Sequence, residues 1–467
     1  MPNSTKIHFE ISERKVLLRI FDITTVLLAL YSVGIIFNFN YFQFSTSNFY
    51  WTIVLGIYLS VFGTVFEMYN LQVASNQVQI IKSIVLTAST TVLVYLLTPI
   101  FTPVLPSNRL QILFFYVAIF LALFVWRLIY VAFFASNRFT KNVILICDKD
   151  QLKELVLGLE NADPHYKVVG YINSDSQKNP EMVGKMPSNL KLIESENLAN
   201  FVSKNAVSEV VVASQNTEGI TPQLYNQLIQ LLENGFMIKE YTQVYETLTQ
   251  RIPVQYVARD FYRYFPFSRS NQNHLYLLFI RLTDLVIGFV GIGAGLVLLP
   301  FILVGNLLAN RGSLFYSQER VGKNGVVFNI VKLRTMIKNA EANGAVFTTL
   351  NDSRVTAFGK IMRKTRIDEF PQFYNIIKGE MSLIGPRPER PVFVNEIAVK
   401  MPFYETRHII KPGLTGWAQV NYAYGESVDD SLIKLQYDLY YIKHRSIFLD
   451  INICVKTLST ILFYRGQ

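Results

Sequence analysis

The sequence predicts a membrane protein of α plus α/β class. We expect a block of four transmembrane helices in residues 1–138, a Rossmann-like α/β domain in 139–250 and a monotopic α/β domain in 251–467. The composition is 51% hydrophobic and only 17% charged, whereas an ordinary soluble protein has roughly 25% charged residues. Five long apolar runs, and a stretch in which short β-type runs alternate with helical ones, support the same division.

The four-helix block is predicted from apolar runs at residues 16–37, 49–66, 83–104 and 110–135. Each run is long enough to span a hydrocarbon layer about 30 Å thick. The loop between the first and second runs (38–48) contains no Lys or Arg, and the loop near Pro103, between the third and fourth runs, contains only Arg109. The N-terminus and the exit at Arg127, Arg138 and Lys141 are basic. The positive-inside tendency therefore places both ends of the block in the cytoplasm.

The Rossmann-like domain is predicted from β-type runs at residues 142–147, 167–172, 208–213 and 236–240, with helical stretches such as 151–159 and 221–234 between them. This alternation indicates a parallel sheet. A dinucleotide site requires glycines directly after the first strand, but the turn here reads CDKD at 147–150. We therefore expect a domain without the dinucleotide fingerprint and with a regulatory or dimerising role, which leaves a homodimer open.

The fifth apolar run, residues 285–308, contains no charged residue and is long enough to cross a bilayer. Basic residues on both sides of the run resist assignment of either side to the exterior. Pro300 lies inside the run and should break the helix at Leu299. We therefore favour a re-entrant helix over residues 280–308 that dips into the membrane and returns to the cytoplasmic face, with a kinked full span as the alternative.

Positive charge is concentrated in one segment of this basic chain, whose formal net charge is +10. Residues 305–411 contain 17 Lys and Arg residues against 9 Asp and Glu, which suits phosphates or anionic lipid. A nucleic-acid partner would require a binding fold or a stacking platform, and neither is recognisable. The two cysteines, Cys147 and Cys454, lack metal-ligand spacing, so we expect no disulfide framework and no zinc site.

Two adjacent carboxylates, Asp368 and Glu369, stand inside the basic segment in RKTRIDEFPQFYNIIKGEMSLIGPRPE, residues 363–389. Apolar residues follow at helical spacing, Pro371 suits a first turn and Gly379 suits a C-terminal cap. The pair would then lie at or near a helix N-terminus, which stabilises carboxylates and bound phosphates. An isolated Asp-Glu pair is more often a capping residue beside a solvated one.

Arginines on both sides of the pair favour the functional interpretation. Arg363 and a second arginine precede it, and Arg387 follows it between Pro386 and Pro388. A planar guanidinium held in a rigid Pro-Arg-Pro turn suits bidentate recognition of phosphate. The alternative is a purely structural turn.

Three weaker candidates for ligand contacts lie outside this motif. Lys332 and Arg334 end a predicted β-hairpin over residues 319–336, and surface charge would explain them equally well. Gln419 lies in KPGLTGWAQVNY, residues 411–422, whose Pro-Gly and Thr-Gly steps indicate turns. The aromatic, basic helices predicted after Asp430, for example 435–445, could lie on the membrane surface, with simple packing as the alternative.

Taken together, these motifs resemble the bacterial sugar transferase family, the polyprenyl-phosphate hexose-1-phosphate transferases that initiate assembly of exopolysaccharide, capsule or O-antigen. The resemblance covers about residues 275–467 and is carried by DEFPQFYNIIKGEMSLIGPRP, residues 368–388. The preceding spans and α/β domain look like the long-chain branch, whose members act on UDP-glucose or UDP-galactose. The family implies a re-entrant helix broken at Pro300 and a magnesium-dependent dyad, Asp368 and Glu369. Phe370 departs mildly from the family pattern, in which leucine is common.

From this resemblance we expect transfer of a hexose 1-phosphate from a UDP-sugar to undecaprenyl phosphate, with release of UMP, at the cytoplasmic face of a bacterial inner membrane. Asp368 would form a phosphoryl-aspartate intermediate, and Glu369 would orient the metal or the nucleophile. Mg²⁺ held by either carboxylate would bridge the diphosphate, with Arg363 and Arg387 as the phosphate clamp. The alternatives are a membrane glycosyltransferase that releases UDP and a non-enzymatic membrane scaffold or sensor.

Overall fold

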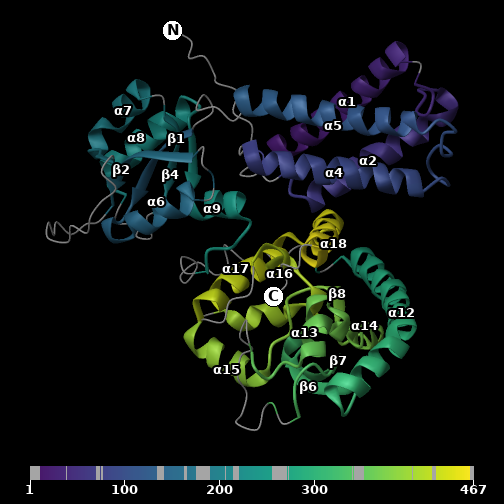
Figure 1. The fold of residues 1–467 in the computed structure, drawn as a ribbon. Coiled ribbons are helices and arrows are strands. Elements are labelled where there is room, and N and C mark those ends of the chain that lie inside the picture. Colours follow the sequence, from purple (N-terminus) through teal and green to yellow (C-terminus); the bar gives the residue numbers. More distant parts are fainter. Residues whose placement is uncertain are drawn as a thin grey trace. The chain divides into compact units, whose positions relative to one another are not determined.

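The computed structural model describes the chain except for residues 1–10, 38, 70–73, 75–76, 134–140, 162, 164–165, 175–189, 206, 214–219, 255–270, 272, 339, 341–351, 402, 423–427 and 463–467. The chain forms two compact units, Met1–Val244 and Tyr245–Gln467 (Figure 1). The predicted boundary at residue 138 lies outside the described residues.

Four long helices form the first part of the first unit: α1 (Ile11–Phe37), α2 (Phe49–Val65), α4 (Gln77–Leu97) and α5 (Leu110–Phe133). All four are long and apolar enough to cross a membrane, and they bury a shared apolar core. The third helix ends at Leu97 and not near residue 104 as predicted. Pro99 explains the earlier end, because a proline disfavours helical geometry in the residue before it.

A buried ion pair joins α1 to α5. Arg127 Nη2 donates to Asp22 Oδ2 at 2.6 Å, and water barely reaches either side chain. The sequence prediction included Arg127 among the basic residues at the cytoplasmic end of the block, but its side chain is buried inside the helix bundle. Orientation of the block therefore depends on the remaining basic residues at its ends.

The second part of the first unit is a parallel sheet in the order β3-β2-β1-β4-β5. Helices α6 (Leu152–Glu160), α7 (Leu198–Lys204) and α8 (Pro222–Glu233) accompany it (Figure 1). This is the strand order expected of a Rossmann-like sheet. The strands are β1 (Lys141–Cys147), β2 (Tyr166–Asn173), β3 (Lys191–Leu192), β4 (Val207–Val212) and β5 (Met237–Glu240).

The second unit begins within α9 (Tyr241–Thr249), the helix that directly follows β5. Its main elements are one long apolar helix, an antiparallel hairpin, a small parallel pair of strands and a set of shorter helices. In order these are α12 (His274–Gly305), β6 (Phe315–Val321), β7 (Val327–Leu333), α13 (Ala357–Lys364), α14 (Gln372–Lys378), β8 (Ser382–Ile384), α15 (Pro391–Lys400), β9 (Gly413–Thr415), α16 (Trp417–Asn421), α17 (Val428–His444) and α18 (Ile447–Leu462). The predicted hairpin is confirmed, with β6 and β7 paired antiparallel.

Helix α12 continues through Pro300 to Gly305, so the predicted break of the helix at Leu299 does not occur. A short π-helical stretch, Asn306–Asn310, follows it. Figure 1 shows that α12 is bent and curves along one side of the unit. A proline removes one backbone hydrogen bond and bends a helix, and α12 is helical on both sides of Pro300. Together with the following stretch, α12 is the fifth candidate membrane span.

Helix α12 packs against α14 through a row of glycines. A Cβ at Gly288 would lie 2.8 Å from Ile377, and one at Gly291 would lie 2.4 Å from the ring of Phe373. A Cβ at Gly295 would lie 3.3 Å from Phe370. Small residues at this spacing allow two helices to approach closely, so the membrane helix is seated directly on the helix that follows the carboxylate pair.

Of the helices predicted to lie on the membrane surface, α17 is a core helix. Leu435, Leu439, Tyr441 and Ile442 in α17 are all buried in the apolar core of the second unit, so simple packing, the alternative, is correct for α17. Helix α18 instead leaves apolar side chains exposed at helical spacing: Ile447, Phe448, Ile451, Leu458 and Ile461. It has the amphipathic pattern of a surface-lying helix.

We predict that Gly291→Ala destabilises the second unit by about 1–3 kcal/mol, because the methyl group would force the Phe373 ring to move in a packed interface. Gly293→Ala is the matched control, since a Cβ there would have no described atom within 4 Å. Thermal unfolding of both variants in detergent measures the difference. An equal effect of the two substitutions would contradict the close packing of α12 on α14.

Candidate active site

The carboxylate pair lies in a single 3-10 turn, Ile367–Glu369, between α13 and α14. Arg366, which precedes the turn, adopts the left-handed conformation with φ 58°. Helix α14 begins three residues after Glu369 and ends at Gly379, whose φ of 91° provides the C-terminal cap. The predicted position of the pair close to a helix N-terminus is confirmed.

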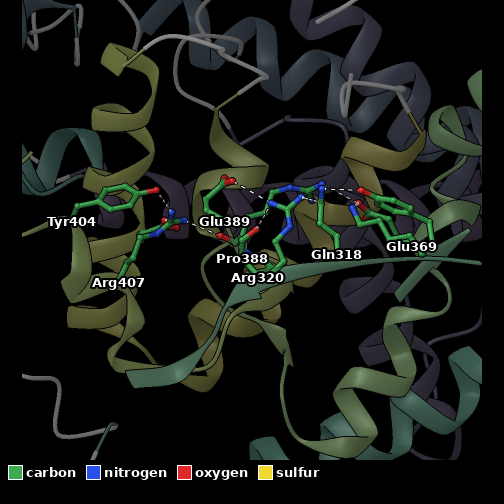
Figure 2. A network of polar contacts seen from close by, with 11 residues as sticks. Gln318, Arg320, Glu369, Pro388, Glu389, Tyr404 and Arg407 are labelled. Carbon is green, nitrogen blue, oxygen red and sulfur yellow. Dashed lines mark hydrogen bonds and ion pairs between the residues drawn. The ribbon is translucent and has the colours of Figure 1, made fainter. Parts of the chain in front are cut away.

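Glu369 is a buried carboxylate surrounded by three cations. Its Oε1 lies 3.0 Å from Arg387 Nη2 and 3.6 Å from Lys332 Nζ, and its Oε2 lies 3.3 Å from Arg366 Nη1. Burial alone would raise the pKa of Glu369, but the three cations outweigh burial and hold its pKa well below the usual range. Glu369 therefore stays ionised at any physiological pH and orients the cations (Figure 2).

Asp368 has the opposite environment, although it is the neighbouring residue. It is 8% exposed, and its Oδ1 is buried without a hydrogen-bond partner among the described residues. Burial and the negative charge of Glu369 raise the pKa of Asp368 to about 6, against the attraction of Lys332 and Arg363. An ionised carboxylate that lacks hydrogen bonds is a good nucleophile or ligand.

Lys332 belongs to the same charge cluster. It projects from β7 and is only 20% exposed at its side chain. Burial lowers the pKa of Lys332 to about 8, while Glu369 opposes the shift. The side chain is therefore still predominantly protonated at pH 7, but it gives up its proton more readily than an ordinary lysine.

The Pro-Arg-Pro turn directs Arg387 toward Glu369. It follows β8, which pairs in parallel with β9. The backbone carbonyls of its three residues each accept a hydrogen bond: Pro386 from Gly413 N at 2.9 Å, Arg387 from Arg407 Nη2 at 3.0 Å and Pro388 from Arg320 Nη1 at 3.0 Å. The side chain of Arg387 remains 31% exposed, so it can reach both Glu369 and a ligand.

Arg320 is a charged residue at the site that the sequence prediction missed as a contact, and Arg366, which the prediction used only as one of the arginines preceding the pair, contacts Glu369. Arg320 on β6 donates to Pro388 O, Glu389 Oε2 and Gln318 Oε1, which Figure 2 shows as a continuous chain of contacts. Its position opposite the turn depends on the pairing of β6 with β7 and on a tertiary contact, and neither leaves a local sequence signal. Arg366 lies beside the motif, three residues before Glu369, and its left-handed backbone precedes the turn that contains Glu369.

Arg363 and Arg334, two further predicted ligand contacts, have different surroundings in the structure. Arg363 on α13 donates its Nε to Thr335 Oγ1 at 2.9 Å and is close enough to influence Asp368. Arg334 is buried and donates to three backbone carbonyls, those of Ser313, Met336 and Asn310. The structure thus uses Arg334 to hold the chain around the end of α12, and does not bring it to the carboxylates.

Gln419 lies on α16, beside β9. Its Nε2 donates to Leu414 O at 3.1 Å, while its Oε1 is buried without a hydrogen-bond partner among the described residues. The amide therefore contacts β9, the strand that begins at Gly413, whose N–H donates to Pro386 O. Gln419 is therefore connected to the carboxylate pair only indirectly, through the paired strands β8 and β9.

The carboxylates suit a magnesium ion only in part. No group of three or more His, Cys, Asp and Glu side chains that could hold a metal is found in the described part of the chain. Mg²⁺ commonly takes one or two carboxylates and completes its shell with water and substrate phosphates. The unpartnered Oδ1 of Asp368 fits that role, whereas both oxygens of Glu369 already contact cations.

Comparison with known proteins identifies the family. A profile described as bacterial sugar transferase matches residues 275–464. A putative undecaprenyl-phosphate N-acetylgalactosaminyl 1-phosphate transferase of Bacillus subtilis (strain 168) is 41% identical over 141 residues, which are 30% of this chain and 79% of that protein. The chain belongs to the bacterial sugar transferase family. The match covers α12 to α18, so the carboxylate pair and its cations all lie in the sugar transferase domain.

Two further relatives extend over more of the sugar transferase domain. The UDP-N-acetylgalactosamine-undecaprenyl-phosphate N-acetylgalactosaminephosphotransferase of Aeromonas hydrophila is 41% identical over 222 residues, 47% of this chain and 51% of that protein. The UDP-glucose:undecaprenyl-phosphate glucose-1-phosphate transferase of Xanthomonas campestris pv. campestris is 34% identical over 195 residues, 41% of this chain and 40% of that protein. The chain therefore spans about half the length of these two relatives or less.

We predict that neutralising the two carboxylates has opposite effects on the stability of the sugar transferase domain. The raised pKa of Asp368 means that its negative charge destabilises the fold as pH rises from about 4 to about 6, and the full cost is present above that range. Asp368→Asn should therefore raise stability at pH 7.5 by about 1–3 kcal/mol. Glu369→Gln should lower it by about 3–5 kcal/mol, because three cations lose their anion.

Thermal unfolding of the purified protein at pH 7.5 measures both changes. Glu396→Gln is the control, since Glu396 is exposed and pairs with Lys400 at the surface of α15, where a pair contributes little. A loss of stability in Asp368→Asn would contradict the unequal environments of the two carboxylates.

Proposed function

We propose that this protein transfers a sugar 1-phosphate from a UDP-sugar to undecaprenyl phosphate and releases UMP. The observation that carries the proposal is the buried Asp368 carboxylate, whose Oδ1 has no hydrogen-bond partner among the described residues, beside a carboxylate that contacts three cations. Relatives in the same family are named for transfer of N-acetylgalactosamine phosphate or glucose 1-phosphate to undecaprenyl phosphate. The reaction would be the first membrane step of exopolysaccharide, capsule or O-antigen assembly.

The reaction proceeds in two displacements at phosphorus. A carboxylate oxygen of Asp368 attacks the β-phosphorus of the UDP-sugar, a new oxygen–phosphorus bond forms, and the bond to the bridging oxygen breaks so that UMP leaves. An oxygen of undecaprenyl phosphate then attacks the same phosphorus and displaces the aspartate carboxylate. A covalent intermediate divides one difficult reaction between two anions into two easier ones.

The cations around Glu369 reduce the repulsion between the reacting anions. Arg387 and Lys332 lie on one oxygen of Glu369 and Arg366 on the other, so all three can turn part of their hydrogen-bonding capacity toward the donor diphosphate. Fixed cations in a site that excludes water stabilise developing charge without reorganisation. Glu369 acts by orienting these groups and does not serve as a base, because the acceptor phosphate is already ionised.

Magnesium is part of the proposal, with Asp368 Oδ1 as the protein oxygen that fits it best. A bound Mg²⁺ would neutralise charge on the diphosphate and on the departing UMP. Glu369 could supply a second oxygen only if a cation such as Lys332 moved from it to a substrate phosphate. Binding of the donor would then replace the ion pair between Lys332 and Glu369 by one between Lys332 and a substrate phosphate.

The membrane arrangement follows from the apolar helices. We propose that α12 is a re-entrant helix, that the carboxylate pair lies at the cytoplasmic face of the bacterial inner membrane, and that membrane lipids contact its apolar surface. Its residues Leu278, Phe279, Val286 and Phe289 are more than half or about half exposed, as expected of side chains that face lipid. The acceptor lipid could then reach Asp368 without leaving the bilayer.

The transferred sugar is proposed at the level of a hexose. Glucose and galactose follow from the sequence resemblance, and the relatives named for N-acetylgalactosamine add a third candidate. A panel of UDP-glucose, UDP-galactose and UDP-N-acetylgalactosamine with undecaprenyl phosphate, scored by UMP release, tests the donor.

The homodimer that the sequence left open is a separate question. Light scattering of the purified protein tests whether it forms.

We predict that Asp368→Ala reduces UMP release by at least about 10³-fold, since the nucleophile of the first displacement is lost. Glu396→Ala on α15 should behave as wild type. Release of UDP in place of UMP would identify a glycosyltransferase, and an Asp368→Ala protein with unchanged function in cells would identify a scaffold or sensor. Either result rejects the proposed reaction.

The covalent intermediate has its own test. Wild-type protein incubated with donor labelled at the β-phosphate, without acceptor lipid, should retain label, and Asp368→Asn should retain none. Addition of undecaprenyl phosphate should release the label into lipid. If wild-type protein transfers sugar phosphate but never carries label, the donor is attacked directly by the lipid.

We predict an acid limb near pH 6 in kcat/KM for the donor, because Asp368 must be ionised to attack. Lys332→Gln removes a cation that lowers the pKa of Asp368, so the limb should move to higher pH. Lys378→Gln is the matched control, since Lys378 is exposed and pairs with Glu380. Rates measured from pH 5 to 9 decide the point, and an acid limb that is the same in all three proteins would count against Asp368 as the nucleophile.

A further inference from the structure

Arg407 is a buried arginine behind the Pro-Arg-Pro turn, in the 3-10 helix Tyr404–Ile409. It is 5% exposed and contacts its own 3-10 helix and two other segments of the chain. Its Nη1 donates to Tyr404 Oη at 2.6 Å, and its Nη2 donates to Asp438 Oδ2 at 2.8 Å and to the backbone carbonyl of Arg387 at 3.0 Å. Figure 2 shows Arg407 at the opposite end of the polar network from Glu369.

The turn itself depends on contacts of this kind. Pro386 and Pro388 have no N–H groups, so the turn cannot be fixed by hydrogen bonds that those residues donate. Its carbonyls are held from outside, by Gly413, Arg407 and Arg320. The central carbonyl belongs to Arg387, the residue whose guanidinium meets Glu369.

Arg407 is the more strongly fixed of the two arginines that hold the turn. Its counter-ion, Asp438 on α17, is 2% exposed, and α17 lies in the apolar core of the unit. Arg320 is more exposed, and one of its hydrogen bonds goes to Gln318 in its own strand, β6. A planar guanidinium can bridge several acceptors in a fixed geometry, which the single ammonium of lysine cannot reproduce.

We propose that Arg407 is a positioning residue: anchored by Asp438 and Tyr404, it fixes the Arg387 carbonyl so that the Arg387 guanidinium is aimed at Glu369 and the donor phosphates. Arg407 itself touches no reacting atom. The inference rests on the proposed function for its effect on the reaction, but the position of the turn can be measured without turnover. Misplacement of a binding group by about 1 Å is enough to slow a reaction on the order of 10²-fold.

The first test is hydrogen–deuterium exchange of the full-length protein in detergent. Arg407→Lys should increase exchange at the three turn amides, those of Gly385, Arg387 and Glu389. Arg445→Lys is the matched control, because Arg445 is also buried and lies over the rings of Tyr276 and Tyr441, away from the turn. Equal exchange of the turn in both variants would overturn the proposal.

The second test is a double-mutant cycle scored by UMP release. Arg407→Lys should raise the donor KM and lower kcat/KM on the order of 10–100-fold, while Arg445→Lys keeps the wild-type donor KM. Added to Arg387→Lys, Arg407→Lys should have little further effect, because it acts through Arg387. Full, independent effects of the two substitutions would contradict positioning.

A milder variant covers the case in which Arg407→Lys does not fold. Tyr404→Phe removes one hydrogen-bond acceptor of Arg407 and no charge. It should increase hydrogen–deuterium exchange of the turn and the donor KM in the same direction as Arg407→Lys, but by a smaller amount. An unchanged turn in Tyr404→Phe, with Arg407→Lys unfolded, would assign Arg407 to the stability of the core and reject the proposal. If wild-type protein releases no UMP from any donor, the proposed function fails, while the exchange result still judges the positioning role.

Discussion

The ion-pair cluster at Glu369 is the interaction on which the site depends. A buried carboxylate is costly unless cations compensate it, and here Arg387, Lys332 and Arg366 come from three separate segments to do so. The cluster therefore brings the Pro-Arg-Pro turn, the hairpin and the carboxylate turn to one point. Glu369 also fixes the electrostatics of Asp368, because its negative charge and the shared burial raise the pKa of the neighbouring carboxyl.

Two polar side chains on α12 connect the membrane helix to this cluster. Arg281 donates to the carbonyls of Ile376 and Ile377 at 2.8 and 2.6 Å, where it satisfies groups left open at the end of α14. Asp284 accepts from Ser382 Oγ at 3.0 Å and from Leu383 N at 2.7 Å, at the start of β8. One helix face therefore positions both the helix after the carboxylate pair and the strand before Arg387.

The sequence predicted the parts of this site that are local. The helix after Asp368 and Glu369, its glycine cap, and the hairpin bearing Lys332 follow from turn residues and periodicity, and the structure has each of them. Pro300 misled the prediction because a proline can bend a helix without ending it.

Long-range contacts were beyond the sequence. The contact of Arg407 with the carbonyl of Arg387 joins residues 20 apart, and that of Arg320 with Pro388 joins residues 68 apart. Arg334 looked like a ligand contact only because the burial that commits it to backbone carbonyls has no signature in a single sequence. Basic composition predicted a site for anions, but it could not say which cations serve the fold and which serve a ligand.

The geometry of the 3-10 turn explains how adjacent carboxylates come to have opposite environments. Such a turn has about three residues per turn, so neighbouring side chains point roughly 120° apart. Glu369 can then face Arg387 and Lys332 while Asp368 points elsewhere, toward a position where its Oδ1 meets no partner in the described part of the chain. The left-handed backbone of Arg366 separates the turn from α13. Arg366 itself forms an ion pair with Glu369, so the cluster that neutralises one carboxylate includes the residue that precedes the turn leaving the other available.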